Sequence, residues 1–237
     1  MGNLQPTEKR IYERLDRHPY ILRYYGEYSQ GNGLPNGLVF QYQRAGTLMD
    51  NLALSKYPEK RTQWPVQAAE ALRFIHTKNV IHSDFGCHNF LIQKDGSLAL
   101  ADFGGSRIDN ISAAVSYPTR YARPCSDDSV STEIDDLFAL GMIIYEISVK
   151  HLLYADRPSR EIRKSLHQHE FPDLDTVTPN LQVVIRKCWS NGYQTAEEVI
   201  RDLEATPSPS YPHLFCFTGL FLGIVITVFI IIRRRSF

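Results

Sequence analysis

The chain has 237 residues, of which 43% are hydrophobic and 22% are charged, so it can bury one sizeable core and is not disordered by composition. Its 26 basic residues balance its 26 acidic ones, which argues against a nucleic-acid partner, because such partners usually require a basic excess. The four cysteines show no metal-binding spacing and are interpreted as free thiols of a reducing compartment. They are Cys87, Cys125, Cys188 and Cys216.

Three elements are predicted before residue 45. They are a helix over residues 8–15 and strands over residues 21–26 and 37–42. In the helix, Ile11 and Leu15 lie one turn apart. The helix is expected to end before Pro19, because proline disfavours helical backbone in the residue that precedes it. Residues 1–10 are polar, which predicts no secretory signal peptide.

Four helices are predicted further along the chain. The first has an apolar face at helical spacing, formed by Trp64, Ala68, Ala71, Leu72 and Ile75. Residues 134–147 are apolar nearly all round, which is typical of a helix buried in the middle of a domain. An amphipathic helix follows over residues 181–189. The pattern of a capping box at Thr195–Glu198 then predicts a last helix that runs through Leu203.

Three polar side chains are expected to converge in the middle of the chain. Asp84 and Asn89 precede two apolar runs that flank Asp95-Gly96, a strong short-range signal of a β-hairpin, and Asp102 follows the second run. Because a hairpin returns the chain on itself, Asp102 is expected to lie beside Asp84 and Asn89. Two carboxylates and an amide oxygen are the kind of ligands that magnesium prefers.

These residues carry a resemblance to a known family. The segment His82-Ser83-Asp84 to Asn89, followed by Asp102-Phe103-Gly104, resembles the catalytic loop H-R-D-x-x-x-x-N and the metal loop D-F-G of the eukaryotic protein kinases. The resemblance implies ATP and Mg²⁺ as cofactors and a protein as the substrate. It implies that Asp84 accepts the proton of the substrate hydroxyl, that Asn89 binds one magnesium ion, and that Asp102 binds magnesium that bridges the phosphates.

The resemblance runs collinearly from about residue 8 to about residue 204. It implies an α+β fold of two lobes in a domain over residues 1–204, with a small β lobe over residues 1–43 and a mainly α-helical large lobe over residues 44–204. Residues 84–86 also spell Asp-Phe-Gly, but only the second copy follows a hairpin and an apolar strand, so the second copy is interpreted as the metal loop.

Further roles are implied by the same resemblance. Glu8 would be the acid that pairs with a lysine of the small lobe, although a solvated glutamate on a helix face is an equal alternative. The backbone from Gln41 to Gln43 would form the hinge that hydrogen-bonds adenine, and Leu91 would pack under the adenine ring. Asp136, in a match to D-x-W/F-x-L-G, would anchor the backbone of the catalytic loop; the alternative is a helix-capping aspartate.

The sequence also departs from the family pattern. Residues 1–7 would span only roughly 25 Å at about 3.5 Å each, too short for a glycine-rich hairpin and a strand that carries the phosphate-binding lysine. The small lobe is therefore expected to be truncated, and Lys9 cannot pair with its helix neighbour Glu8. Ser83 replaces an arginine that usually clamps a phosphate on the activation loop. Gly86 replaces the lysine typical of Ser/Thr kinases, which leaves the class of hydroxyl open.

A last departure involves a pair of residues. Cys125 stands where the family has the glutamate of A-P-E, and Tyr193-Gln194 stand where the family has the arginine that pairs with this glutamate. Losing both partners of a buried ion pair is tolerable, whereas losing one would leave an uncompensated charge. The sequence is therefore interpreted as a self-consistent variant.

The carboxyl-terminal tail is predicted to be separate from the domain. Residues 205–213 form a Pro/Ser linker, and residues 214–232 are uncharged and apolar. At about 1.5 Å per residue they match a bilayer core of about 30 Å, which predicts one transmembrane helix. A buried core helix and a removable lipid-anchor signal are the weaker alternatives. The basic tail 233–237 favours a cytosolic carboxyl terminus, but the lack of an export signal favours a tail-anchored, single-pass protein whose domain is cytosolic.

The sequence leaves three hypotheses for the function. The leading one is a membrane-anchored, ATP-dependent protein kinase that acts on Ser or Thr. The second is a pseudokinase that serves as a membrane-bound interaction module, because the phosphate-binding lysine and the glycine-rich loop are missing. The third is that the true start lies upstream and completes the small lobe. The substrate and the membrane are not specified by the sequence.

Overall fold

The computed structural model describes residues 4–29, 37–54, 56–109, 111–124 and 130–205. All of them belong to one compact unit that spans residues 1–206. The predicted transmembrane segment 214–232, the linker beyond residue 205 and the basic tail lie outside the described residues. Within the described part of the chain, no helix is both long and apolar enough to cross a bilayer.

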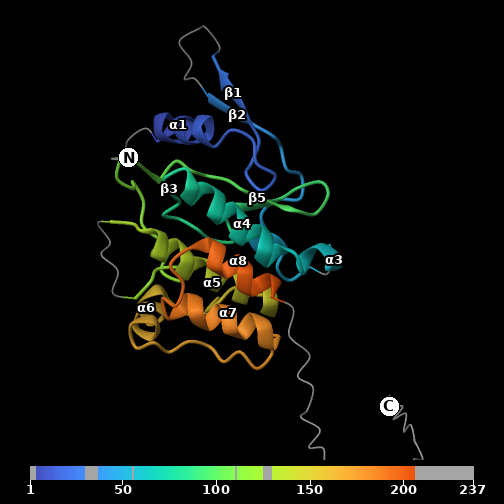
Figure 1. Cartoon of the computed structure of the whole chain (residues 1–237), viewed down its shortest axis with the longest axis vertical. Helices are drawn as coiled ribbons and strands as arrows, with labels where there is room; N and C mark the ends of the chain where they lie inside the picture. The colour runs from blue at the N-terminus through green and yellow to red at the C-terminus, as the bar shows by residue number, and fades with distance from the viewer. Residues whose placement is uncertain (1–3, 30–36, 55, 110, 125–129, 206–237) are drawn as a thin grey trace, which may run out of the picture. The chain divides into compact units, whose positions relative to one another are not determined.

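The amino-terminal elements form a small α+β layer (Figure 1). Helix α1 spans Gln5–Leu15, and it begins three residues before the predicted start because Pro6 is favourable in a first helical turn. Strands β1 (Tyr24–Tyr28) and β2 (Gly37–Phe40) pair antiparallel, with a register shift between Tyr24 and Gly26. The predicted helix and both predicted strands are thus confirmed, with shifted ends.

The predicted hairpin is also present. Strands β4 (Phe90–Ile92) and β5 (Leu98–Leu100) pair antiparallel, with Phe90 opposite Leu100. The Asp95 carboxylate accepts hydrogen bonds from the backbone N–H and the hydroxyl of Ser97, at 3.0 and 2.6 Å, which closes the turn. A second short pair, β3 (Val80–Ile81) with β6 (Arg107–Ile108), encloses the hairpin in sequence. Asp84 and Asn89 lie in the segment between β3 and β4, and Asp102 lies in the segment between β5 and β6.

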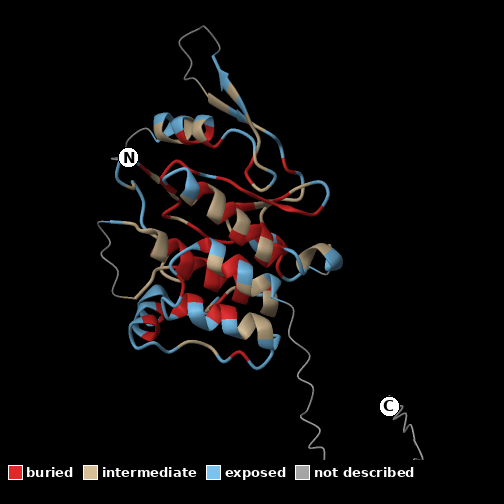
Figure 2. Ribbon diagram, in the orientation of Figure 1, coloured by how far each residue is buried: buried red, intermediate tan, exposed pale blue. Residues whose placement is uncertain are grey.

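Helices make up most of the remaining chain. They are α2 (Leu48–Asn51), α3 (Pro58–Arg61), α4 (Trp64–Thr77), α5 (Glu133–Val149), α6 (Ser159–His167), α7 (Pro179–Trp189) and α8 (Ala196–Glu204). Helix α5 is the buried centre, because it packs against α4 and α7 and is buried from Asp135 to Ile147 (Figures 1 and 2). This confirms the prediction made from its nearly all-round apolar sequence.

The start of α8 differs in detail from the prediction. The Thr195 hydroxyl accepts a hydrogen bond from the backbone N–H of Glu198, as a capping box requires. The Glu198 carboxylate, however, accepts from the backbone N–H of Gln194, one residue before the position that the motif specifies. Both groups still satisfy N–H donors at the helix start, so the helix begins where the sequence predicts.

Main-chain hydrogen bonds join the amino-terminal layer to the hairpin. The segment between α1 and β1 runs beside β5, and Ile21 forms a parallel bridge with Leu100. The backbone N–H of Leu22 donates to the Leu100 carbonyl at 2.8 Å, and the Leu100 N–H donates to the Tyr20 carbonyl at 2.9 Å. The two parts of the fold are therefore linked through the strand that leads into Asp102.

Candidate active site

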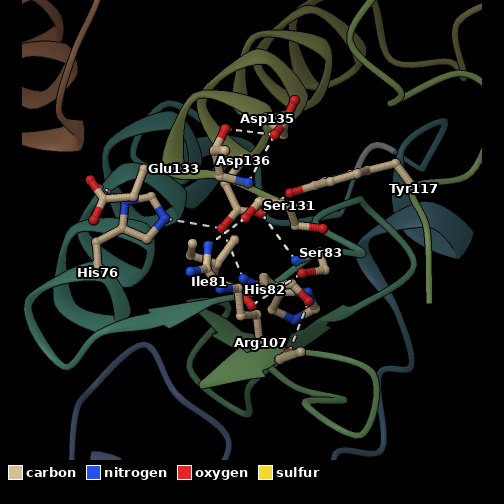
Figure 3. Close-up of polar contacts among 12 residues, drawn as sticks. His76, Ile81, His82, Ser83, Arg107, Tyr117, Ser131, Glu133, Asp135 and Asp136 are labelled. Carbon is tan, nitrogen blue, oxygen red and sulfur yellow. Dashed lines mark hydrogen bonds and ion pairs between the residues drawn. The ribbon is translucent and has the colours of Figure 1, made fainter. Parts of the chain in front are cut away.

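The buried carboxylate of Asp136 holds the segment that carries Asp84. Its oxygens accept hydrogen bonds from the backbone N–H groups of His82 and Ser83, at 2.8 and 3.2 Å. Figure 3 shows the side chains of His76 and Tyr117 also directed at this carboxylate, with His76 Nε2 at 3.0 Å and the Tyr117 hydroxyl donating to Oδ1. The predicted anchoring role is confirmed, whereas the capping box of α5 uses the neighbouring residue, Asp135, with Thr132.

This network determines the ionisation of Asp136. Burial by itself raises the pKa of the carboxyl, but hydrogen bonds and charge from His76, with further contributions from His82 and Tyr117, bring the pKa below its ordinary value. The carboxylate is therefore charged at neutral pH and fully hydrogen-bonded. A buried charge in this condition is costly to disturb, because removing it would take a charged acceptor away from several buried donors.

A column of aromatic rings connects α1 to the same network. The Tyr12 ring lies edge-on to Phe103, with centroids 5.1 Å apart, and Phe103 lies 5.0 Å from His82. One ring nitrogen of His82 is 3.0 Å from the Ala101 carbonyl oxygen. Burial lowers the pKa of His82, so the ring is neutral at physiological pH. Helix α1 is thus linked to the segment before Asp84 by contacts through Tyr12, Phe103 and His82.

The hairpin brings Asn89 and Asp102 to its open end. The register that pairs Phe90 with Leu100 continues outward, and the Ala101 N–H donates to the Asn89 carbonyl at 2.9 Å. The Asn89 amide nitrogen donates to the Asp84 carbonyl and carboxylate, at 2.8 and 3.1 Å. This leaves the Asn89 amide oxygen without a partner among the described residues. Asp102 is exposed and adopts a left-handed backbone, with φ of 60°.

These residues fit a magnesium ion of the kind that the resemblance implies. No three His, Cys, Asp or Glu side chains cluster tightly enough to hold a metal ion in the described ranges. Magnesium does not need such a cage, because it usually keeps several waters and binds one or two carboxylates together with substrate phosphates. The exposed Asp102 carboxylate and the unpaired oxygen of Asn89 are hard donors of this type. They are the residues that would hold the ion.

The predicted hinge has one backbone carbonyl and one backbone N–H that could hydrogen-bond a ligand. The N–H of Gln41 donates to the Arg23 carbonyl at 2.9 Å and so extends the β1–β2 ladder. The carbonyl of Gln41 and the N–H of Gln43 have no hydrogen-bond partner within the described residues. Gln43 is buried, and its side-chain Nε2 has no hydrogen-bond partner among the described residues. Leu91 is half-buried on β4 and bridges to Thr47.

Glu8 lies at the metal-loop side of α1. Burial and then the charge of Asp102 raise the pKa of Glu8, while the backbone N–H of Phe103 opposes this shift. Glu8 forms no ion pair with any residue that the structure describes, and Lys9 instead reaches Glu27 on β1 at 2.8 Å. Lys9 thus pairs with acids other than Glu8. The predicted role of Glu8 toward a lysine stays a prediction.

Sequence reasoning missed two tyrosine contacts in the segment that follows the metal loop. Tyr117 binds Asp136, as described above, and Tyr121 donates to the Glu146 carboxylate at 2.7 Å. Glu146 also accepts from the backbone N–H of Leu153 at 2.9 Å. One signal was present in the sequence: Glu146 interrupts the apolar run that follows Asp136 in α5, and a buried ionisable group needs partners. The identity of those partners depends on tertiary packing.

The two-part fold, the anchored loop and the hairpin with polar groups at its open end define a kinase-like domain. The chain matches the protein kinase domain family over residues 3–199. It therefore belongs to the protein kinase family, and the resemblance read from the sequence is correct at this level.

Individual relatives share less than a third of their aligned residues with the chain. It is 31% identical over 176 residues to the serine/threonine-protein kinase RUNKEL of Arabidopsis thaliana, an alignment that covers 70% of this chain and 13% of the relative. It is 30% identical over 165 residues to Aurora kinase A-A of Xenopus laevis, with 65% of this chain and 39% of the relative covered. It is 28% identical over 178 residues to a cAMP-dependent protein kinase, catalytic subunit-like, of Caenorhabditis briggsae, with 69% and 43% covered. The chain thus spans less than half the length of each.

Proposed function

We propose that the domain transfers a phosphoryl group from Mg-ATP to a serine or threonine hydroxyl of a protein. The observation that carries the proposal is that Asn89 and Asp102 flank the open end of one hairpin, while the Asn89 amide is hydrogen-bonded to Asp84. Serine/threonine specificity is supported by the Arabidopsis relative, which is a serine/threonine-protein kinase by name.

Each of these residues would have its own role in the transfer. Asp84 accepts the proton of the attacking hydroxyl, and Asn89 keeps the Asp84 carboxylate oriented while presenting its own oxygen to a metal ion. Magnesium, when bound, neutralises charge on the phosphates. The free carbonyl of Gln41 and the free N–H of Gln43 match the donor and acceptor edge of adenine. Leu91 supplies apolar surface beneath that ring.

Phosphotransfer assays on the full chain in detergent test this proposal. Asp84→Asn should lower turnover by about 10²-fold or more, because a positioned general base contributes on that order. Asp95→Asn is the matched control, since Asp95 lies in the hairpin turn of the same segment and its side chain accepts hydrogen bonds from Ser97, within that turn. Equal turnover of Asp84→Asn and the wild type would refute the assignment.

The alternative function is a pseudokinase that acts as an interaction module. It is supported by Ser83 and Gly86, which stand where the family pattern has an arginine and a lysine, so two cationic side chains are missing from the catalytic loop. Preorganised donors of this kind are commonly worth about 10²- to 10³-fold in rate. Mg-ATP binding without any phosphotransfer by the wild type would favour this alternative.

Anchoring to a membrane is a further part of the proposal. It rests on the uncharged, apolar run 214–232 and the arginines that follow it. We propose one transmembrane helix with the kinase domain in the cytosol. Protease treatment of intact vesicles should digest the amino-terminal domain, and protection of that domain would refute this orientation.

A further inference from the structure

The side chain of His88 folds back onto Asp84. His88 Nε2 lies 3.0 Å from Asp84 Oδ1, and both side chains are 26% exposed. The other carboxylate oxygen, Oδ2, accepts from the Asn89 amide at 3.1 Å. Each oxygen of the Asp84 carboxylate therefore has its own donor, provided that the His88 proton is on Nε2. Two donors on adjacent residues hold the carboxylate plane, which otherwise rotates in a broad, roughly two-fold well.

Gly86 makes room for this arrangement. A Cβ atom at position 86 would lie 2.5 Å from Cε1 and 2.7 Å from Nδ1 of His88, and 2.8 Å from the Tyr121 ring. Contacts this short force the neighbour to move. Tyr121 is held by its hydrogen bond to the buried Glu146, so it cannot give way easily. Any side chain at position 86 would therefore displace the His88 ring from Asp84.

We propose that His88 is a positioning residue for Asp84, and that Gly86 is required because it leaves space for the imidazole. This inference rests on the proposed function, in which Asp84 is the base. The ring fixes the carboxylate so that its remaining lone pairs face the open side of the site. Fixing a reacting group in advance removes an orientational cost, and a misplacement of about 1 Å can cost on the order of 10²-fold in rate.

Four variants of the full chain test the proposal by steady-state kinetics. His88→Ala should lower kcat by about 10- to 100-fold and leave the KM for Mg-ATP unchanged. His88→Gln should recover part of the loss, because its amide N–H can replace Nε2–H. Gly86→Ala should reproduce His88→Ala, and the Gly86→Ala/His88→Ala double variant should be no worse than either single one, since both remove the same contact. His151→Ala is the matched control, because the His151 ring hydrogen-bonds to no described residue other than the adjacent Leu152 carbonyl.

A second measurement does not depend on turnover. Nitrogen-15 NMR of the imidazoles should show a fixed Nε2–H tautomer for His88 in the wild type. In Gly86→Ala, the His88 signal should move to the averaged position of a free histidine.

The outcomes separate the two proposals. Turnover by the wild type together with an equally active His88→Ala variant would overturn the role of His88 and leave the proposed function intact. Additive losses in the double variant, or an Nδ1–H tautomer in the wild type, would also overturn it. A wild type that transfers no phosphoryl group would overturn the proposed function, and with it the catalytic consequence of the contact.

Discussion

Replacing Asp136 by asparagine should release the catalytic loop from α5. The carboxylate accepts from the backbone N–H groups of His82 and Ser83 on different oxygens. An asparagine amide can keep an oxygen toward only one of these donors, and its NH₂ group must face the other. One buried N–H is then left without an acceptor, at a cost of about 1–3 kcal/mol. The remaining bond loses its charge, which removes roughly a further 1 kcal/mol.

The total expected loss is about 2–4 kcal/mol, a large share of the roughly 5–15 kcal/mol by which domains are usually stable. Urea unfolding at pH 7 measures this loss. Hydrogen exchange adds a local readout, because the amides of His82 and Ser83 should exchange faster in Asp136→Asn. Asp202→Asn is the matched control. Asp202 also accepts from a tyrosine and a lysine, but its side chain is 35% exposed, so its loss should cost below about 1 kcal/mol.

An equal free energy of unfolding for Asp136→Asn and the wild type would contradict this prediction. Unchanged hydrogen-exchange protection of the His82 and Ser83 amides would also contradict it, since the loop would then be held by other contacts. Lowering the pH should also remove the stabilising contribution of Asp136. The pKa of Asp136 is lowered in the folded state, so its contribution is present above the ordinary aspartate pKa and is lost as the pH falls through the folded value.

Three further predictions concern other contacts. Burial raises the pKa of Glu146, so its stabilising contribution is present below the ordinary glutamate pKa and lost as pH rises; urea unfolding should therefore show a larger cost of Glu146→Gln at pH 5 than at pH 8. Trp64→Phe should cost about 1–3 kcal/mol in urea unfolding, because its ring N–H donates to the buried Gly96 carbonyl at 2.9 Å; an unchanged midpoint would contradict this. Arg14→Ala should lower the thermal midpoint through loss of its Asp109 pair, and the loss should shrink at high salt; a salt-independent loss would point to packing instead.

Much of the fold was predictable because its signals are local. The hairpin follows from Asp95-Gly96 between two apolar runs, and the central helix follows from its apolar sequence, which needs no knowledge of its neighbours. The anchoring contact of Asp136 was predicted only through the family resemblance. Its geometry joins residues more than fifty positions apart, which periodicity does not reveal.

The parts that sequence reasoning missed depend on tertiary contacts. Helix α6 contains few buried residues, and strands β3 and β6 have two residues each. None of these three elements gives a periodic pattern of useful length. The contact between His88 and Asp84 was missed for a different reason. Gly86 was interpreted as the loss of a lysine, whereas the structure shows that its missing side chain makes room for the neighbouring ring.

The hydrogen bonds between residues 20–22 and β5 have a consequence for how the domain can move. Both hydrogen bonds involve the backbone of Leu100, one through its carbonyl and one through its N–H. The amino-terminal elements and the hairpin therefore cannot separate at this point without breaking two main-chain hydrogen bonds. Because β5 leads directly into Asp102, the strand that holds residues 20–22 is also the strand that sets where the metal loop begins.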